Sequence, residues 1–208
     1  MLSTNLFLSF CSMNFLFSIS TLSAYAFCFF NKIPFYNSAD KNNFRKLKTI
    51  VFNGSLSLVE SIYFTNIFLS NDVVVYQYNN SFKILTNLFF YTLYVEFIYY
   101  FLHRVYHTKY LYKIIHKTHH ETSDVYPVDA FHFSFIDTQG MFFSLGVPVY
   151  ILRMSFYEYL FVLYIYLTFA YISHSKILYE HHIIHHKYMK YNYCMLIPYF
   201  DLLLKTYK

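Results

Sequence analysis

Histidines are the residues of this chain whose type and spacing could do chemistry. All 11 lie between His103 and His186, and the first hundred of the 208 residues contain none. Most of them fall into three clusters, which read HRVYH from His103, HKTHH from His116 and HIIHH from His182. Within a cluster the histidines follow i, i+4 or i, i+3, i+4 spacing, which places side chains on one face of a helix. Each cluster can therefore aim several imidazoles at one point.

Clustered imidazoles of this kind favour a metal site. Neutral imidazole is a strong ligand for iron, zinc and copper. The three clusters supply eight histidines, which is too many for one tetrahedral zinc ion with four ligands. A single HxxxH is often only a polar helix face, but three clusters in one chain indicate ligation. We predict two metals that share a site, although imidazole ligands alone do not choose the metal.

The composition indicates a membrane protein. The chain is 57% hydrophobic and 13% charged, whereas an ordinary soluble domain carries about 25% charged residues. The net charge of +5 comes without a basic stripe or a nucleic-acid motif, so we expect no nucleic-acid partner. Three scattered cysteines argue against a disulfide framework or a thiolate zinc site. They are Cys11, Cys28 and Cys194.

The apolar segments predict an all-α, polytopic helical membrane protein with about four transmembrane spans. The expected spans cover residues 5–30, 49–70, 82–102 and 141–173. The last is interrupted by Pro148 and Arg153 and forms either a bent span or a hairpin of two shorter helices. The first is either a retained span or a cleaved signal, because AYA from Ala24 resembles a cleavage site. Glu60 inside the second span is a functional candidate, although packed neighbours could simply tolerate it.

Lysines and arginines set the expected orientation. Five of them follow the first span, whereas residues 71–80 contain neither. The positive-inside rule then places the histidine clusters and the C-terminal lysines in the cytosol. We divide the chain into an N-terminal membrane-anchor region, 1–81, with two spans and a basic loop, and a catalytic region, 82–208. The expected architecture is a helical membrane anchor that carries a cytosolic layer of histidines.

These motifs resemble the histidine boxes of the fatty acid hydroxylase and sterol desaturase superfamily, which are membrane non-haem di-iron enzymes. Only eight residues separate His107 from His116, whereas acyl-CoA desaturases space their first two boxes much further apart. Within the superfamily the chain is most similar to sterol C-5 desaturases (lathosterol oxidases). They share an AFH element, here ending at His132, and a YNY element, here ending at Tyr193. The similarity extends from about Tyr94 to the C-terminus.

The resemblance implies which residues form the site. Nine histidines are implied as ligands of a di-iron centre: His103, His107, His116, His119, His120, His174, His182, His185 and His186. Glu96, Arg104 and His132 are implied as supporting catalytic residues, and His132 is also a candidate tenth ligand. His181 is open between a position behind the ligands and the surface, because one helical face does not hold both it and the His182 triad comfortably.

The chain departs from the family pattern between the boxes. The family's Pro and Asp after AFH are Phe133 and Phe135 here, although Asp137 lies close by. The glycine after YNY is Cys194. These changes leave the histidine boxes complete but blur the features that identify a substrate.

The resemblance also implies a reaction, which is the O₂-dependent oxidation of an unactivated C–H bond in a membrane lipid. Two iron ions carry the chemistry, while the protein supplies ligation, orientation and a dry channel. We expect sterol C-5 desaturation in sterol biosynthesis. The alternatives are sterol C-4 methyl oxidation, fatty acid or sphingolipid hydroxylation, alkylglycerol cleavage, and a non-catalytic family member.

The same resemblance implies partners and a location. Electrons are expected from NAD(P)H through a reductase and cytochrome b5. Cytochrome b5 is acidic, so the cytosolic lysines and arginines either form its docking surface or only set the membrane topology. The family indicates the endoplasmic reticulum membrane.

Overall fold

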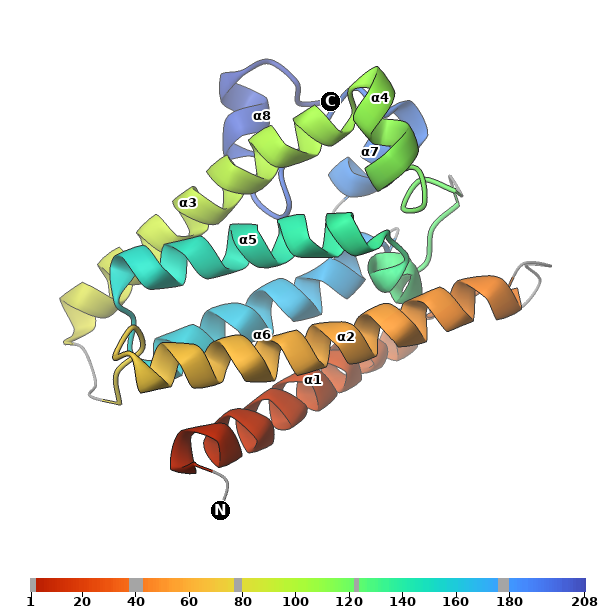
Figure 1. Ribbon diagram of the computed structural model, residues 1–208. Helices are drawn as coiled ribbons and strands as arrows, with labels where there is room; N and C mark the ends of the chain where they lie inside the picture. Colours follow the sequence, from red (N-terminus) through yellow and green to blue (C-terminus); the bar gives the residue numbers. More distant parts are fainter. Residues whose placement is uncertain (1–2, 38–42, 77–79, 122–123, 176–179) are drawn as a thin grey trace.

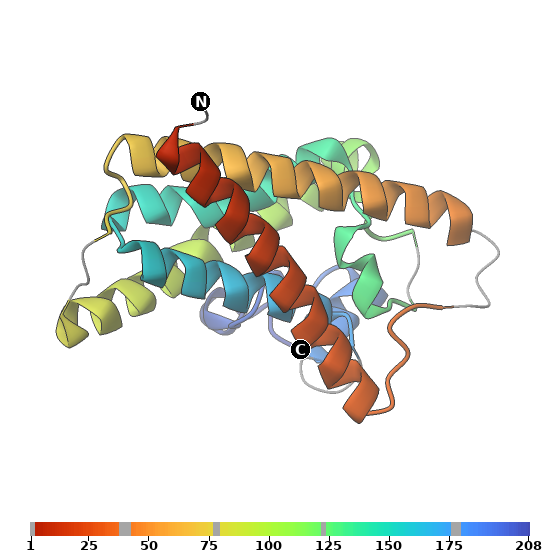
Figure 2. The same ribbon diagram turned by 90° about the horizontal axis from the view of Figure 1, so that it is seen from below.

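Five long helices dominate the structure. The computed structural model describes residues 3–37, 43–76, 80–121, 124–175 and 180–208. The long helices are α1 (Thr4–Phe30), α2 (Asn43–Ser70), α3 (Ser81–Tyr106), α5 (Phe135–Leu152) and α6 (Phe156–Ser173) (Figure 1). Seen from below, α1 lies obliquely across α2 and α6 (Figure 2). No strand forms within the described ranges, which confirms the predicted all-α class.

Short elements gather at the end of the bundle where α3 finishes (Figure 1). They are α4 (Lys109–Leu111), the π-helix η1 (Tyr112–His116), the 3₁₀-helix η2 (Pro127–Phe131) and α7 (Glu180–Tyr188). A last short helix, α8 (Tyr199–Leu203), packs on α3, where the ring of Phe200 contacts that of Phe97 at 5.3 Å between centroids. The histidine clusters therefore lie together at one end of a helical bundle.

Among the residues that the structure describes, four helices are long and apolar enough to cross a membrane, namely α1, α3, α5 and α6. The predicted segment 141–173 lies within a hairpin of two of them, not one bent span. The hairpin turns at Arg153, whose backbone is left-handed (φ 49°), while Pro148 stays inside α5. Ser155 then starts α6 with a capping box, in which its hydroxyl accepts from the Glu158 N–H and the Glu158 carboxylate accepts from the Ser155 N–H.

Helix α2 holds the segment predicted as the second span, although its composition alone does not mark it as a span. It contains the expected residues 49–70 but begins at Asn43, and it is not among the four helices that are apolar enough to cross. Its buried face explains this, because it carries polar side chains at every fourth position: Asn53, Ser57, Ser61 and Thr65. Its outer face exposes large apolar side chains such as Val59 and Tyr63. Polar residues that point inward and apolar residues that point outward suit a helix beside lipid.

Two buried carboxylates hold the C-terminal segment in place by hydrogen bonds, one from α3 and one from within the segment. Glu96 of α3 accepts hydrogen bonds from the backbone N–H groups of residues 195–197, at 2.7 to 3.1 Å. Asp201 accepts from the N–H groups of Tyr193 and Cys194, each at 2.8 Å. These bonds fix the segment after α7, whose backbone carbonyls contact the histidines.

Candidate metal centre

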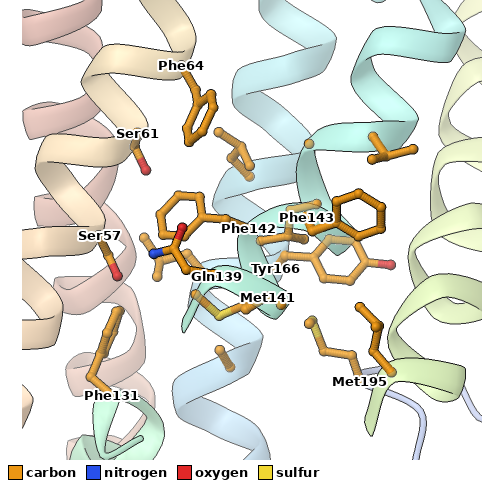
Figure 3. Close-up of a pocket in the computed structure, with 18 of the residues that line it drawn as sticks. Ser57, Ser61, Phe64, Phe131, Gln139, Met141, Phe142, Phe143, Tyr166 and Met195 are labelled. Atoms are coloured by element: carbon orange, nitrogen blue, oxygen red, sulfur yellow. The ribbon is translucent and has the colours of Figure 1, made fainter. Parts of the chain in front are cut away.

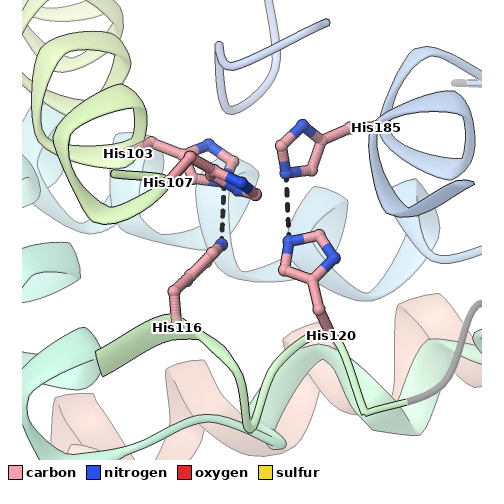
Figure 4. Close-up of side chains that lie close together, drawn as sticks. All are labelled: His103, His107, His116, His120 and His185. Atoms are coloured by element: carbon pink, nitrogen blue, oxygen red, sulfur yellow. Dashed lines mark hydrogen bonds between the residues drawn. The ribbon is translucent and has the colours of Figure 1, made fainter. Parts of the chain in front are cut away.

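Nine histidines converge and form two groups. The five-histidine group contains His103, His107, His116, His120 and His185 (Figure 4). The four-histidine group contains His119, His174, His182 and His186. Within each group the candidate ligand atoms all lie within 4.8 Å of one another, so that each group could hold a metal ion. The nine members are the nine histidines that the family resemblance implied as ligands.

The first two clusters come from α3 and from the turns that follow it. His103 lies in the last turn of α3, and His107 is its C-cap residue. His116 is the last residue of the π-helix η1, and His119 and His120 lie in the turn after it. A single π-helical turn is rare and is frequently found at functional sites. The expectation of a regular helix for the second cluster is therefore wrong, since a π-helix and the turn after it carry these histidines.

The second and third clusters each divide between the two groups. In each cluster the i, i+4 pair serves one group, and the i+3 histidine serves the other. The choices are opposite: His119 alone from the second cluster joins the four-histidine group, and His185 alone from α7 joins the five-histidine group. Adjacent residues of a helix point about 100° apart. The expectation that each cluster aims at one point thus holds only for the i, i+4 pairs.

Hydrogen bonds to the outer ring nitrogens fix the orientation and the tautomer of five of these imidazoles. In each, Nδ1 lies against an oxygen: Tyr193 O for His103 (2.8 Å), Asp137 Oδ2 for His116 (2.7 Å), His132 O for His119 (3.3 Å), Ala170 O for His174 (2.8 Å) and Tyr191 O for His185 (2.7 Å). A carbonyl or an ionised carboxylate only accepts hydrogen bonds. Nδ1 therefore carries the proton, and Nε2 turns its lone pair towards the centre of the group.

The inward nitrogens lie at distances that suit a shared cation. His103 Nε2 and His116 Nε2 are 2.9 Å apart, and two lone pairs at that distance repel unless a cation lies between them. The other close Nε2–Nε2 pairs are 3.1 to 3.2 Å apart. Two nitrogens that each lie about 2.1 Å from one ion are separated by about 3.0 Å at a right angle and about 3.4 Å at a tetrahedral angle. The donor set therefore fits metal ions.

Two further properties make these imidazoles ready to bind a metal. The Nε2 atom of His107 is buried and has no hydrogen-bond partner among the described residues. Burial lowers the pKa of His107 to about 2 and that of His185 to about 3. Burial also lowers the pKa of His119 and His186 well below the usual value. The rings therefore stay neutral at physiological pH, and neutral imidazole is the form that binds metals.

Two of the three residues implied as supporting the site lie apart from both histidine groups. Glu96 is fully buried and bonds the backbone of residues 195–197, so its contacts hold the C-terminal segment. Arg104 is exposed, and its Nη1 donates to the hydroxyl of Tyr100 at 2.9 Å. Neither side chain contacts a member of the two groups through a described hydrogen bond.

The two remaining histidines also lie outside the groups. His132 contacts the centre through its backbone carbonyl, which accepts from His119, while its Nε2 lies 3.1 Å from Glu121 Oε2. His181 is buried and its carbonyl accepts from Asn192 Nδ2 at 2.9 Å, so it is not a surface residue. Both residues lie next to histidines of the centre without joining its ligand set.

Sequence reasoning missed the partners that orient the ligands. Asp137 stands in the first turn of α5, where the Ser134 hydroxyl accepts from its N–H, and its carboxylate accepts a hydrogen bond from His116 Nδ1–H. Its only sequence signal is its closeness to the position of the family's Asp after AFH. The backbone carbonyls of Tyr191 and Tyr193 carry no sequence signal at all, because any residue type supplies a carbonyl.

A cavity of about 720 Å³ lies beside the histidines within the helical bundle (Figure 3). Its walls come from α1, α2, α3, α5, α6 and η2 and from Met195 of the C-terminal segment, and most of the lining side chains are apolar. Tyr106 lines it, and its ring centroid is 6.2 Å from that of His116. Ala170 also lines it and accepts the hydrogen bond of His174. The cavity thus borders both histidine groups, and its volume lies within the range of about 300 to 1,000 Å³ typical of ligand pockets.

Comparison with known proteins identifies the family. The family model described as fatty acid hydroxylase matches residues 88–206, which is more than half of the chain and includes all nine histidines of the centre. Members of this family are typically oxidoreductases and usually depend on iron. No curated protein and no solved structure matches the chain. With its histidine centre and its helices that are long and apolar enough to span a membrane, the chain belongs to the fatty acid hydroxylase family.

Proposed function

We propose that the protein is a membrane oxygenase that uses two iron ions and O₂ to oxidise a C–H bond of a lipid. One observation supports this most strongly: imidazoles whose protons are held on Nδ1 turn their Nε2 lone pairs towards two common points. The apolar cavity beside those points offers space for a lipid. The family supports iron as the metal.

The chain's own residues would bind, orient and exclude water. When bound, the iron ions supply the activation of O₂ and the oxidation of the substrate. The five-histidine and four-histidine groups would each hold one ion. Asp137 keeps the proton of His116 on Nδ1 and so keeps Nε2 available for a metal. The apolar walls of the cavity would hold the hydrocarbon part of the lipid and keep water from the reacting carbon.

Sterol C-5 desaturation is the specific reaction that we propose. The AFH element that ends at His132 and the YNY element that ends at Tyr193 support it. In this reaction two hydrogens leave neighbouring ring carbons and a double bond forms. The second candidate is a hydroxylase of fatty acids or sphingolipids, in which oxygen returns to the carbon, and the family description supports the fatty acid form.

We propose cytochrome b5 as the electron donor, reduced from NAD(P)H by its reductase, with the histidine centre facing the cytosol at the endoplasmic reticulum. Exposed lysines beside the centre support an acidic partner: Lys109 on α4, Lys113 on η1 and Lys187 on α7. Cations on such a surface would steer an acidic protein towards it, and the association would weaken with salt. The alternative is that these charges only set the topology.

Expression in cells that lack their own sterol C-5 desaturase tests the reaction, with sterols and other lipids profiled by mass spectrometry. We expect Δ5,7 sterols to return with the wild-type chain and not with His185→Ala. Unchanged sterols together with new hydroxylated lipids would instead support the hydroxylase. Metal analysis of the anaerobically purified protein is the independent check. Iron well short of two ions per chain, or full activity in His185→Ala, would contradict the di-iron centre.

A further inference from the structure

The cavity beside the histidine centre has one polar wall. Ser57 and Ser61 of α2 and Gln139 of α5 line it, and Figure 3 shows their polar ends within the cavity among apolar side chains. Ser57 and Ser61 stand four residues apart, so their hydroxyl groups face the same side of α2. The other labelled lining residues on these two helices are apolar, including Phe64, Met141 and Phe142.

The hydroxyl group of Ser57 makes no hydrogen bond that would stabilise the described part of the fold. Ser57 is 1% exposed, and its Oγ has no hydrogen-bond partner in the part of the chain that the structure describes. A buried hydroxyl without a partner destabilises a protein, whereas an alanine would occupy the same place without that cost. The serine is therefore better explained by something that enters the cavity than by packing.

The amide of Gln139 is held in a fixed orientation. Its Nε2 donates to Glu60 Oε1 at 2.8 Å, from α5 to α2. This bond directs the NH₂ group towards Glu60 and leaves the amide oxygen as an acceptor. Together with the two serine hydroxyls, the wall offers groups that can both donate to and accept from a hydroxyl group. A purely hydrocarbon lipid would leave the buried Ser57 hydroxyl without a partner among the described residues.

The cavity extends to the outer surface of the bundle. Several lining residues are themselves exposed: Phe64 on α2 (37%) and Ile136, Phe143 and Tyr150 on α5 (46%, 56% and 68%). Helix α5 is one of the helices able to span a membrane. An occupant that arrives along this flank comes from the lipid phase, and it must be mostly apolar to match the remaining walls.

We propose that the cavity binds lipids that carry a hydroxyl group, which hydrogen-bonds to Ser57, Ser61 and Gln139. The bond anchors the lipid at one point and so determines which of its carbons lies next to the histidine centre. The second part of this inference rests on the proposed lipid oxidation, whereas the binding itself does not. The hydroxyl belongs either to a sterol ring or to a long-chain alcohol, and the test separates the two.

Binding of matched lipids to the full-length, metal-loaded protein tests the proposal. The probes are cholesterol and cholestane, which lacks the hydroxyl group, and octadecanol and octadecane as the chain-type pair. We expect the hydroxylated member of one pair to bind about tenfold more tightly. Ser57→Ala should reduce that preference several-fold without changing the affinity for the hydrocarbon. Ser55→Ala, the same change at an exposed position of the same helix, should leave both affinities unchanged.

A thermal melt separates this role from a structural one. Ser57→Ala should melt at or above the wild-type temperature, because it removes a buried hydroxyl without a described partner. Equal affinity for both members of each pair in the wild type would overturn the proposal. An equal loss for hydroxylated and hydrocarbon lipids in Ser57→Ala would overturn it as well. Since binding is measured without turnover, a protein that prefers the alcohol but oxidises no lipid would contradict only the proposed function.

Discussion

Asp137→Asn is the most direct test of how the metal ligands are oriented. The Asp137 carboxylate accepts a hydrogen bond from His116 Nδ1–H at 2.7 Å, and the side chains of Asp137 and His116 are 11% and 1% exposed. The amide keeps the shape of the side chain but can turn its NH₂ group towards Nδ1, which then leaves the proton on Nε2, where a metal must bind. A buried hydrogen bond to a charged group contributes about 1.5 to 3 kcal/mol. At about 1.4 kcal/mol per factor of ten, we expect metal affinity to fall about 10- to 100-fold.

The assay is a competition titration of the purified protein with a chelator, which yields metal affinity and ions bound per chain. Asp72→Asn is a matched control, because Asp72 is exposed at the opposite end of the bundle and its left-handed backbone (φ 53°) suits asparagine. Asp137 acts through one ligand, so its substitution should have little further effect in a His116→Ala background. Wild-type affinity in Asp137→Asn, or fully additive losses in the double variant, would refute this account of the centre.

Three further predictions concern residues around the centre. Glu96→Gln replaces one acceptor oxygen that faces backbone N–H groups, so we expect the free energy of unfolding to fall by about 1 to 3 kcal/mol. The metal content per folded chain should stay unchanged. A lower metal content at an unchanged melting temperature would argue for a direct role of Glu96 at the metals. Arg104→Ala should leave the metal content unchanged, because the side chain is exposed and bonds Tyr100, and elemental analysis showing metal loss would contradict its placement outside the site. The metal-free protein should lose stability as the pH falls from 7 to 5: burial depresses the pKa of His107 to about 2 and of His185 to about 3, so the unfolded chain binds protons below about pH 6.5 that the folded chain does not. Each ring then lowers the free energy of unfolding by about 2 kcal/mol between pH 7 and pH 5. A denaturation midpoint that stays constant or rises on acidification would contradict the burial of these rings.

The sequence allows the helical membrane fold to be predicted because long apolar segments are local signals. It places the break near Arg153 within the last apolar segment but does not choose between a bend and a hairpin. Helix α2 is harder to predict as a span, because its polar residues Asn53, Ser57 and Ser61 lower its mean hydropathy. Only the tertiary structure shows that these residues lie on the buried face. Mean hydropathy averages over both faces of a helix, so it does not reveal that the polar residues of α2 lie on one face and the apolar residues on the other.

The histidines of the centre are visible in the sequence because their spacing is local, whereas their division into two groups is not. That division depends on the π turn of η1 and on the approach of α7 to α3. The groups that hold the rings, such as the carbonyls of Tyr191 and Tyr193, are supplied by the backbone and become acceptors only when the chain folds. For Glu96, the position before the first box implies a supporting role, and the structure adds contacts that the sequence does not reveal, with the backbone N–H groups of residues 195–197.

The division of two clusters between the groups has a consequence for assembly of the centre. The turn that holds His119 also holds His116 and His120, and α7 likewise supplies both groups. An ion bound in either group therefore orders the segments that complete the other, and the second ion binds to rings whose conformational entropy has already been lost. We expect positive cooperativity between the two sites. During titration with substoichiometric metal, chains with two ions and chains with none would then predominate over chains with one.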